Sequence, residues 1–144
     1  MAIYFLGGVK LELPFDAIER SKEVERVVMR GEERLYYRFR FAPEFYDGIA
    51  TGDAIGCNLL CACCWNFERN LHPAETILAK FYPPQYVAQR LENLANKHNC
   101  PHVRISGAEP FLGEASARHV LNILRTIKKD VVIETNGIML GFHP

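Results

Sequence analysis

Residues 102–137 read HVRISGAEPFLGEASARHVLNILRTIKKDVVIETNG, and their pattern decides the fold. Apolar residues on one face predict a strand over 102–106, and the apolar run 131–133 predicts a second, buried strand. An amphipathic helix lies between them, with an acid near its start and lysines near its end to complement the helix dipole: Glu114, Val120, Ile123, Leu124, Ile127, Lys128 and Lys129.

The same order of elements extends toward the N-terminus. Residues 48–55 form a short candidate strand that runs into a cysteine-rich loop. A second helix begins at Pro83–Pro84 and ends before Pro101, because its apolar residues follow helical spacing: Val87, Leu91, Leu94 and Ala95. Strands separated by helices form right-handed βαβ units, so the sequence predicts an α/β fold with a parallel sheet.

Residues 1–47 have a different character and are expected to be a β-rich N-terminal extension with a hairpin. Residues 25–29 and 35–41 are rich in β-branched and aromatic side chains, and they flank a turn at 30–33. Arg38 and Arg40 alternate with apolar residues, which favours the solvated face of a half-exposed strand. Residues 48–144 form the second part of the chain.

The composition indicates a globular protein with ordinary solubility. The chain has 144 residues, 49% of them apolar and 24% charged, and 17 basic residues balance 17 acidic ones. This balance gives no indication of nucleic-acid binding. No apolar run approaches the ~20 residues that cross a bilayer, and the N-terminus lacks a secretory signal, so we expect a cytoplasmic protein without a membrane partner.

The cysteines indicate a metal site. Cys57, Cys61 and Cys64 have Cys-x-x-x-Cys-x-x-Cys spacing in one short loop, and closely spaced thiolates suit an iron–sulfur cluster. Three ligands leave one iron open for a substrate or cofactor. Cys63 is either a spare thiol or a substitute ligand, whereas the isolated Cys100 is expected to be a buried small hydrophobe.

Two other interpretations of the cysteine loop stay open. One is a non-catalytic iron–sulfur or electron-transfer module. The other is a zinc site that adds Cys100 or His72 as a fourth ligand, although zinc sites more often pair two Cys-x-x-Cys knuckles and this sequence has no second knuckle. Metal content distinguishes zinc from iron and sulfide.

Two further motifs follow the other predicted strands, so all three clusters share the carboxyl edge of the sheet, where α/β proteins bind ligands. In the motif 106–110, Gly107 and Ala108 permit close approach of a ligand, and Glu109 offers a carboxylate to an ammonium or hydroxyl group. In the motif 134–137, Glu134 needs a hydrogen-bonding partner such as a ribose diol. Tight turns with solvated side chains are the alternative for both motifs.

This ordered set of motifs, over residues 50–137, resembles the radical S-adenosylmethionine (radical SAM) superfamily. The resemblance implies that Cys57, Cys61 and Cys64 bind a 4Fe-4S cluster whose fourth iron binds S-adenosyl-L-methionine. It also implies that the cofactor is held by a further set of residues: Gly107, Ala108, Glu109, Pro110, Glu134 and Asn136. Two residues depart from the family pattern, since Cys63 replaces an aromatic residue and Ala108 replaces a glycine.

The resemblance also implies an activity and a fold. The expected chemistry is reductive cleavage of S-adenosylmethionine to a 5′-deoxyadenosyl radical, with no side-chain general base. The segment 134–137 is most similar to glycyl-radical-enzyme activases. Residues 48–144 would then be the N-terminal half of a (β/α) barrel, in a fragment or half of an assembly.

The expected partners follow from that resemblance. They are an electron donor such as ferredoxin or flavodoxin, an unidentified substrate that is a protein in the activase case, and a second chain that completes the barrel. A copy of the same chain would serve as that second chain.

Overall fold

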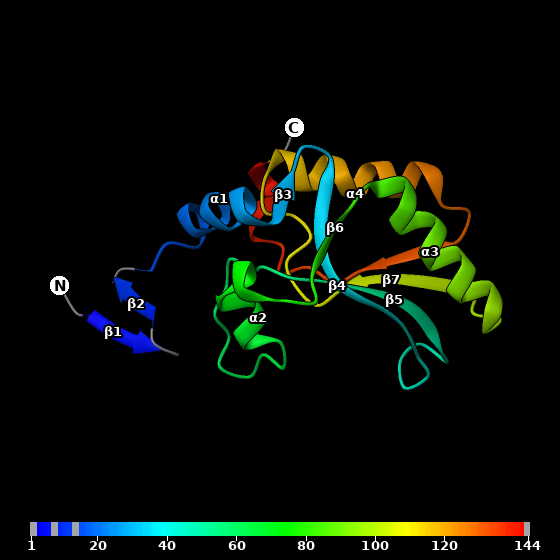
Figure 1. Ribbon diagram of the computed structural model, residues 1–144, viewed down its shortest axis with the longest axis horizontal. Helices are drawn as coiled ribbons and strands as arrows, with labels where there is room; N and C mark the ends of the chain where they lie inside the picture. The colour runs from blue at the N-terminus through cyan, green and yellow to red at the C-terminus, as the bar shows by residue number, and fades with distance from the viewer. Residues whose placement is uncertain (1–2, 7–8, 13–14, 143–144) are drawn as a thin grey trace.

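The computed structural model describes residues 3–6, 9–12 and 15–142, and it has a mixed α/β fold (Figure 1). A curled half-barrel sheet holds six strands in the order β3-β4-β5-β7-β8, with β6 paired to β4. The strands are β3 (Met29–Arg30), β4 (Glu33–Ala42), β5 (Ile49–Ala54), β6 (Lys80–Tyr82), β7 (His102–Ser106) and β8 (Asp130–Ile133). Two further strands, β1 (Ile3–Leu6) and β2 (Val9–Glu12), form a separate antiparallel pair.

The predicted parallel unit is confirmed. β5 pairs in parallel with β7, and β7 pairs in parallel with β8. The two connecting helices, α3 (Pro84–Lys97) and α4 (Glu114–Thr126), lie on one side of these strands (Figure 1). Their buried residues pack with the sheet into the main core: Val87, Leu91, Ala95, Val103, Ile105, Val120 and Ile123.

The register of the strands gives the sheet two unlike faces. The residues on the helix-covered face are small or apolar: Phe39, Ala50, Gly52, Val103, Ile105, Val131 and Ile133. The opposite face carries polar and charged residues: Arg38, Arg40, Thr51, Asp53, Arg104 and Ser106. This polar face belongs to the concave side of the curled sheet, where it lines a cavity.

The prediction of a strand at residues 25–29 is wrong over most of its length. Residues Ala17–Val28 form helix α1, whose N-cap Asp16 accepts hydrogen bonds from the amides of Ile18 and Glu19 at 2.8 and 3.1 Å. Ser21, Val24 and Val28 are buried at helical spacing. Burial of that face of the helix outweighs the strand preference of the two adjacent valines.

The hairpin is confirmed in its turn and second strand. Gly31, with φ +61°, lies in the turn between β3 and β4. β4 pairs with β5 in the main sheet, and a bulge at Tyr37 interrupts that pairing. The division of the chain into 1–47 and 48–144 stays a prediction. In the structure, strands from both parts belong to the same sheet.

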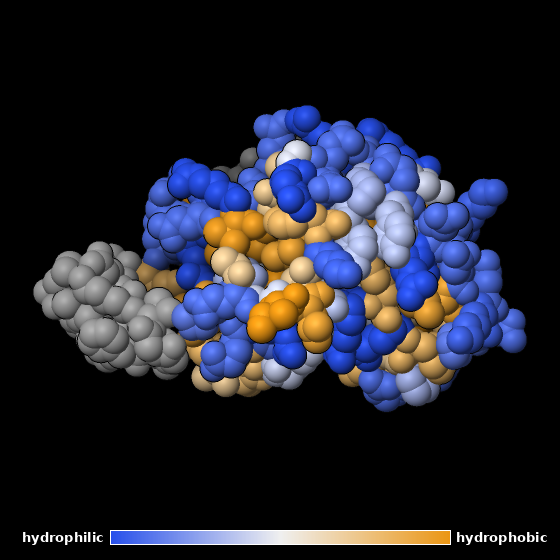
Figure 2. Space-filling model, in the orientation of Figure 1, coloured by the Kyte–Doolittle hydropathy of each residue, from blue (hydrophilic) through white to orange (hydrophobic). Residues whose placement is uncertain are grey.

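The remaining elements are short. Helix α2 (Phe67–Leu71) and the 3-10 helix η1 (Pro73–Glu75) follow the cysteine loop, and η2 (Ile138–Phe142) follows β8. In the described part of the chain, each helix is too short or too polar to cross a bilayer. Figure 2 shows hydrophobic side chains near the middle of one face, bordered by hydrophilic ones.

Candidate metal and cofactor site

The cysteine loop begins directly after β5, at a position that only glycine fits. Gly56 has φ +90°, and a Cβ there would lie 2.6 Å from a Val28 side-chain carbon and 2.8 Å from one of Val24. Helix α1 therefore packs against the start of the loop. This close packing fixes the direction in which the chain leaves the sheet edge.

The predicted ligands are all in this loop. Cys57 and Cys64 are half-buried, Cys61 is exposed, and the Cys64 amide donates to the Cys61 carbonyl at 3.0 Å. Burial raises the pKa of the Cys57 thiol, and the nearby charge of Glu109 acts in the same direction. Metal binding would offset this cost, because a bound iron favours the thiolate.

The other two cysteines differ from these three. Cys63 is exposed beside Cys64, so the sequence position that the family gives to an aromatic residue faces solvent here. Cys100 is buried in the main core with residues of α3 and β7, as expected for a small hydrophobe. His72, the other candidate zinc ligand, lies 3.6 Å from the Glu75 carboxylate.

A buried arginine joins the cysteine loop to the motif after β7. Arg34 on β4 donates from Nη2 to the carbonyls of Ile55 and Glu109, each at 3.1 Å. Burial lowers its pKa to about 10, which still leaves the guanidinium charged at neutral pH. The sequence pattern gives no signal for Arg34, because this residue lies at the start of a strand that reads as part of a simple hairpin.

Two asparagines make a second connection between these loops. Asn70 on α2 accepts from the Gly56 amide at 2.9 Å and donates to the Gly107 carbonyl at 3.0 Å. The same side-chain amide lies 3.7 Å from the Cys64 sulfur. Asn66 also donates to the Gly107 carbonyl, at 2.6 Å, without a recorded contact to a thiol. Together they set the position of Gly107 relative to the cysteines.

The motif 106–110 packs tightly against β5. Gly107 has φ +88°, and a Cβ there would lie 2.6 Å from the Ala54 carbonyl oxygen. Ala108, which replaces a family glycine, is not among the described residues with positive φ, so its backbone does not require glycine. Pro110 is buried. The departure at Ala108 is therefore compatible with the loop conformation.

The Glu109 carboxylate connects the second and third motifs. It is buried, and it accepts from the Phe111 backbone amide at 2.9 Å, the Thr135 hydroxyl at 2.6 Å and the Asn136 backbone amide at 2.7 Å. The predicted contact between Glu109 and the cofactor's ammonium group stays a prediction. Its observed contacts give Glu109 a structural role in holding the two loops together.

The third motif reaches both the cysteines and the cavity. The side-chain amide of Asn136 donates to Asn58 Oδ1 at 2.7 Å, and its nitrogen lies 4.0 Å from the Cys57 sulfur. Glu134 accepts from the Ser106 hydroxyl at 2.5 Å and from Arg104 at 3.1 Å. Its carboxylate lines the cavity, where it could also accept hydrogen bonds from a ribose diol.

The donor set fits an iron–sulfur cluster. Three soft thiols lie on one loop between two fixed ends, and a cubane takes one thiolate at each iron corner. Among the described residues, no three His, Cys, Asp or Glu side chains, the three cysteines included, are grouped closely enough to hold a metal ion. Asn58 Nδ2, next to Cys57, is buried without a partner in the described structure, and the sulfur of a cluster could accept from such a donor.

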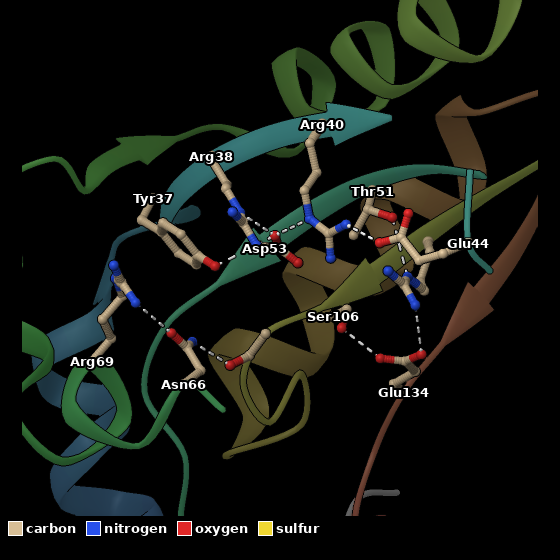
Figure 3. A network of polar contacts seen from close by, with 12 residues as sticks. Tyr37, Arg38, Arg40, Glu44, Thr51, Asp53, Asn66, Arg69, Ser106 and Glu134 are labelled. Carbon is tan, nitrogen blue, oxygen red and sulfur yellow. Dashed lines mark hydrogen bonds and ion pairs between the residues drawn. The ribbon is translucent and has the colours of Figure 1, made fainter. Parts of the chain in front are cut away.

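The cavity beside this loop has a volume of about 540 Å³. Figure 3 shows its polar side chains: Arg38 and Arg40 project from β4 toward Asp53, and Glu134 faces Ser106. The lining consists of Arg38, Arg40, Glu44, Phe45, Trp65, Arg104, Ser106 and Glu134. Arg38 is 44% exposed, in agreement with the expected solvated face, whereas Arg40 is only 22% exposed and the expectation is wrong for it. Both guanidinium groups also bind the buried Asp53 carboxylate, at 2.6 and 2.8 Å.

The comparisons with known proteins agree with the motifs. Residues 54–141, more than half of the chain, match the model of the radical SAM superfamily. A search of curated proteins and a search of solved structures gave no match. Given this match and the three motifs gathered at the carboxyl edge of the sheet, the chain belongs to the radical SAM superfamily.

Proposed function

We propose that this chain binds a 4Fe-4S cluster through Cys57, Cys61 and Cys64 and binds S-adenosyl-L-methionine beside it. Members of the family are enzymes that use these two cofactors. When bound, they supply reductive cleavage of the sulfonium to methionine and a 5′-deoxyadenosyl radical. The observation that carries the proposal is the connection of the cysteine loop to both other motifs through Arg34, Asn70 and Asn136.

The chain's own residues would bind and orient the cofactors. Asn70 and Asn136 bring amide donors to within 3.7 and 4.0 Å of two thiols, and such contacts tune an iron–sulfur cluster. In the second motif, Gly107, Ala108, Glu109 and Pro110 form a compact wall for the methionine portion. Glu134 would hold the ribose, and Asn136 would contact the cofactor next to Cys57. No side-chain base is needed.

A test of this function starts with anaerobic reconstitution with iron and sulfide. Dithionite and S-adenosylmethionine are then added, and 5′-deoxyadenosine is measured by chromatography. We expect a brown protein with about four irons per chain that forms deoxyadenosine in a cluster-dependent manner. A reconstituted cluster that binds no S-adenosylmethionine would favour a non-catalytic electron-transfer module, and a colourless protein with one zinc would favour a zinc site.

We also propose an activase-like reaction on a protein substrate, with an electron donor such as ferredoxin or flavodoxin. The support for this finer proposal is the sequence Glu134-Thr135-Asn136-Gly137. Incubation of the reconstituted chain with a candidate glycyl-radical protein should give a doublet electron paramagnetic resonance signal. Formation of deoxyadenosine without such a signal would support the cleavage activity and contradict the activase assignment.

We also propose a partner that completes the barrel, because the described sheet has an unpaired edge. β8 pairs with β7, and its other side has no strand in the described structure. A second chain or another segment could pair there. Size-exclusion chromatography with light scattering tests self-association, and a monomer at all concentrations would argue against it. The five unpaired thiols support a reducing, cytoplasmic location.

A further inference from the structure

We infer that the cavity on the concave face of the sheet is a substrate site for a small organic anion, whose carboxylate binds Arg40 and Arg104. This assignment rests on the proposed cleavage of S-adenosylmethionine, because it places the anion on the substrate and not on that cofactor, and it is an alternative to the protein substrate of the activase-like reaction. The binding itself requires neither cluster nor cofactor, so it can be measured separately.

The cavity has one end near the cysteine loop and one end away from it. Trp65 and Ser106 lie at the first end, next to the carboxyl ends of the strands. Arg104 precedes Ser106 by two strand positions, roughly 7 Å. Glu44 and Phe45 lie in the connection between β4 and the amino end of β5, so they belong to the second end. The anion site is therefore deeper in the cavity than the cluster loop.

The arginines keep hydrogen-bonding capacity for a ligand. A guanidinium has five donors. Arg104 uses Nε for the Thr51 hydroxyl and Nη1 for Glu134, each at 3.1 Å. Arg40 uses Nε for Asp53 and Nη1 for Glu44. In the described structure, the Nη2 groups of Arg40 and Arg104 have no recorded partner, and both residues line the cavity.

The charged side chains around the cavity leave an excess of positive charge, which an anion would balance. Three of the charged side chains are about half exposed, at 44% for Arg38, 54% for Glu44 and 43% for Glu134, so solvent screens their charges. The remaining charges are the guanidinium groups of Arg40, which is 22% exposed, and Arg104, against one buried carboxylate, that of Asp53. The Arg104 side chain is only 2% exposed. A buried cation in a cavity with excess positive charge favours an anionic ligand.

The walls of the cavity limit the size and kind of ligand. The Arg104 guanidinium carbon lies over the Phe45 ring, 4.4 Å from its centroid, so this aromatic side chain forms one wall beside the charge. Trp65 provides an exposed aromatic surface at the other end. A volume of about 540 Å³ admits a small molecule and excludes a folded protein domain. The structure thus favours a carboxylic acid with an apolar body.

Trp65 gives a direct measurement, because it is the only tryptophan in the sequence and it lines the cavity. The full chain without cluster is titrated with sodium succinate at constant ionic strength while tryptophan fluorescence is recorded. The neutral isostere succinamide serves as the matched ligand. We expect saturable binding of succinate and at least about tenfold weaker binding of succinamide. Equal responses to both, or no saturation, would overturn the inference.

Variants separate binding from structural effects. Arg104→Met should weaken succinate binding about tenfold or more, whereas Arg118→Met, on the exposed surface of α4, should leave it unchanged. Glu44→Gln should tighten binding about two- to fivefold, because it removes a competing carboxylate from Arg40. A structural role alone would not increase affinity. Unchanged affinity in Glu44→Gln would therefore contradict the inference even if Arg104→Met failed to fold.

A last measurement assigns the anion to the substrate. Radiolabelled succinate is dialysed against the reconstituted protein with and without saturating S-adenosylmethionine. We expect succinate to remain bound, because the cofactor's carboxylate would lie at the iron beside the cysteine loop. Displacement of succinate would indicate that the arginines bind the carboxylate of S-adenosylmethionine, and it would overturn the assignment. A protein that binds succinate but forms no deoxyadenosine would retain the anion site and refute the proposed function.

Discussion

The Asn70 side chain donates to the Gly107 carbonyl at 3.0 Å, across 37 residues of sequence. This bond joins the helix after the cysteines to the loop after β7. The same amide reaches toward Cys64, so Asn70 has both a structural contact and a contact with a proposed cluster ligand.

Replacement of Asn70 by Ala should destabilise the protein by about 1–3 kcal/mol, because it leaves the Gly56 amide without its partner and removes one of the two donors to the Gly107 carbonyl. It should also make the reduction potential of the reconstituted cluster more negative, because an amide donor stabilises the reduced, more negative cluster. Redox titration monitored by electron paramagnetic resonance measures the potential, and urea unfolding measures stability.

Asn66→Ala is the control for that variant. Asn66 donates to the same Gly107 carbonyl at 2.6 Å, without a recorded thiol contact. It should lower stability by a smaller amount, because the Gly107 carbonyl keeps its bond from Asn70, and it should leave the potential near that of the wild type. Equal shifts of potential in the two variants would show that loop displacement, and not the contact with sulfur, sets the potential.

Gly107→Ala should lower the free energy of unfolding by more than about 2 kcal/mol. The added Cβ would lie 2.6 Å from the Ala54 carbonyl oxygen, and alanine is strained at φ +88°. Gly137→Ala separates the two effects, since Gly137 has φ +76° but no atom within 4 Å of its Cβ position. It should cost only about 1 kcal/mol. Equal losses in urea unfolding would mean that the contact with Ala54 is relieved by movement of the loop.

Replacement of Cys57, Cys61 or Cys64 by Ala should abolish the cluster, while Cys63→Ala and Cys100→Ala should retain it. Iron content and visible absorption after anaerobic reconstitution measure this directly. Cys100→Ala should lower stability by about 1 kcal/mol, because the Cys100 side chain is in the main core. Loss of the cluster in Cys63→Ala alone would overturn the ligand assignment.

His119 should make the protein less stable in mild acid. Burial lowers its pKa to about 4, below the ordinary value of 6.5, while its ring contacts the Tyr36 hydroxyl and the Glu32 carbonyl at 3.2 and 2.8 Å. The unfolded chain therefore binds a proton first as the pH falls. The free energy of unfolding should decrease between pH 6.5 and 4 by up to about 3 kcal/mol.

The variant His119→Asn should lose this contribution to the pH dependence. Urea unfolding of both proteins at pH 7.0 and 4.5 gives the difference. A wild-type protein that loses no more stability than the variant would show that His119 is protonated in the folded state at pH 4.5.

The parallel part of the fold could be predicted because its pattern is local. Residues 102–137 carry strand and helix periodicities with charged helix ends, and β7, α4 and β8 lie where these periodicities place them. The clustering of motifs at one edge follows from that topology. The contacts that position them do not, since Arg34 and Asn70 join segments far apart in sequence.

Helix α1 shows a different reason for a wrong prediction. Val27 and Val28 favour a strand by residue type, but Asp16 caps a helix whose buried positions are Ser21, Val24 and Val28. A serine among the buried positions hides the apolar periodicity. The sequence feature that could have predicted this helix is Asp16, a residue type that often caps a helix N-terminus.

The role of Arg38 and Arg40 was missed because their partner, Asp53, lies on the neighbouring strand, next to a bulge in β4. Tyr36 pairs with Ala54 and Arg38 pairs with Asp53, so Tyr37 is an extra residue on one strand. Simple alternation would give Tyr36 and Arg38 the same face. The bulge instead sends Tyr36 into the core and Arg38 to the cavity, where its guanidinium meets a buried carboxylate that no strand pattern reveals.

That one extra residue also limits how the cavity can be transplanted or redesigned. A designer who copies this segment onto a regular strand and keeps Tyr37 would place Tyr36 and Arg38 on the same face, so one of them would lose its present surroundings. Omission of Tyr37 would instead leave Tyr36 opposite Ala54 and Arg38 opposite Asp53, as in the natural pairing. The cavity therefore tolerates a regular β4 only if that strand is one residue shorter.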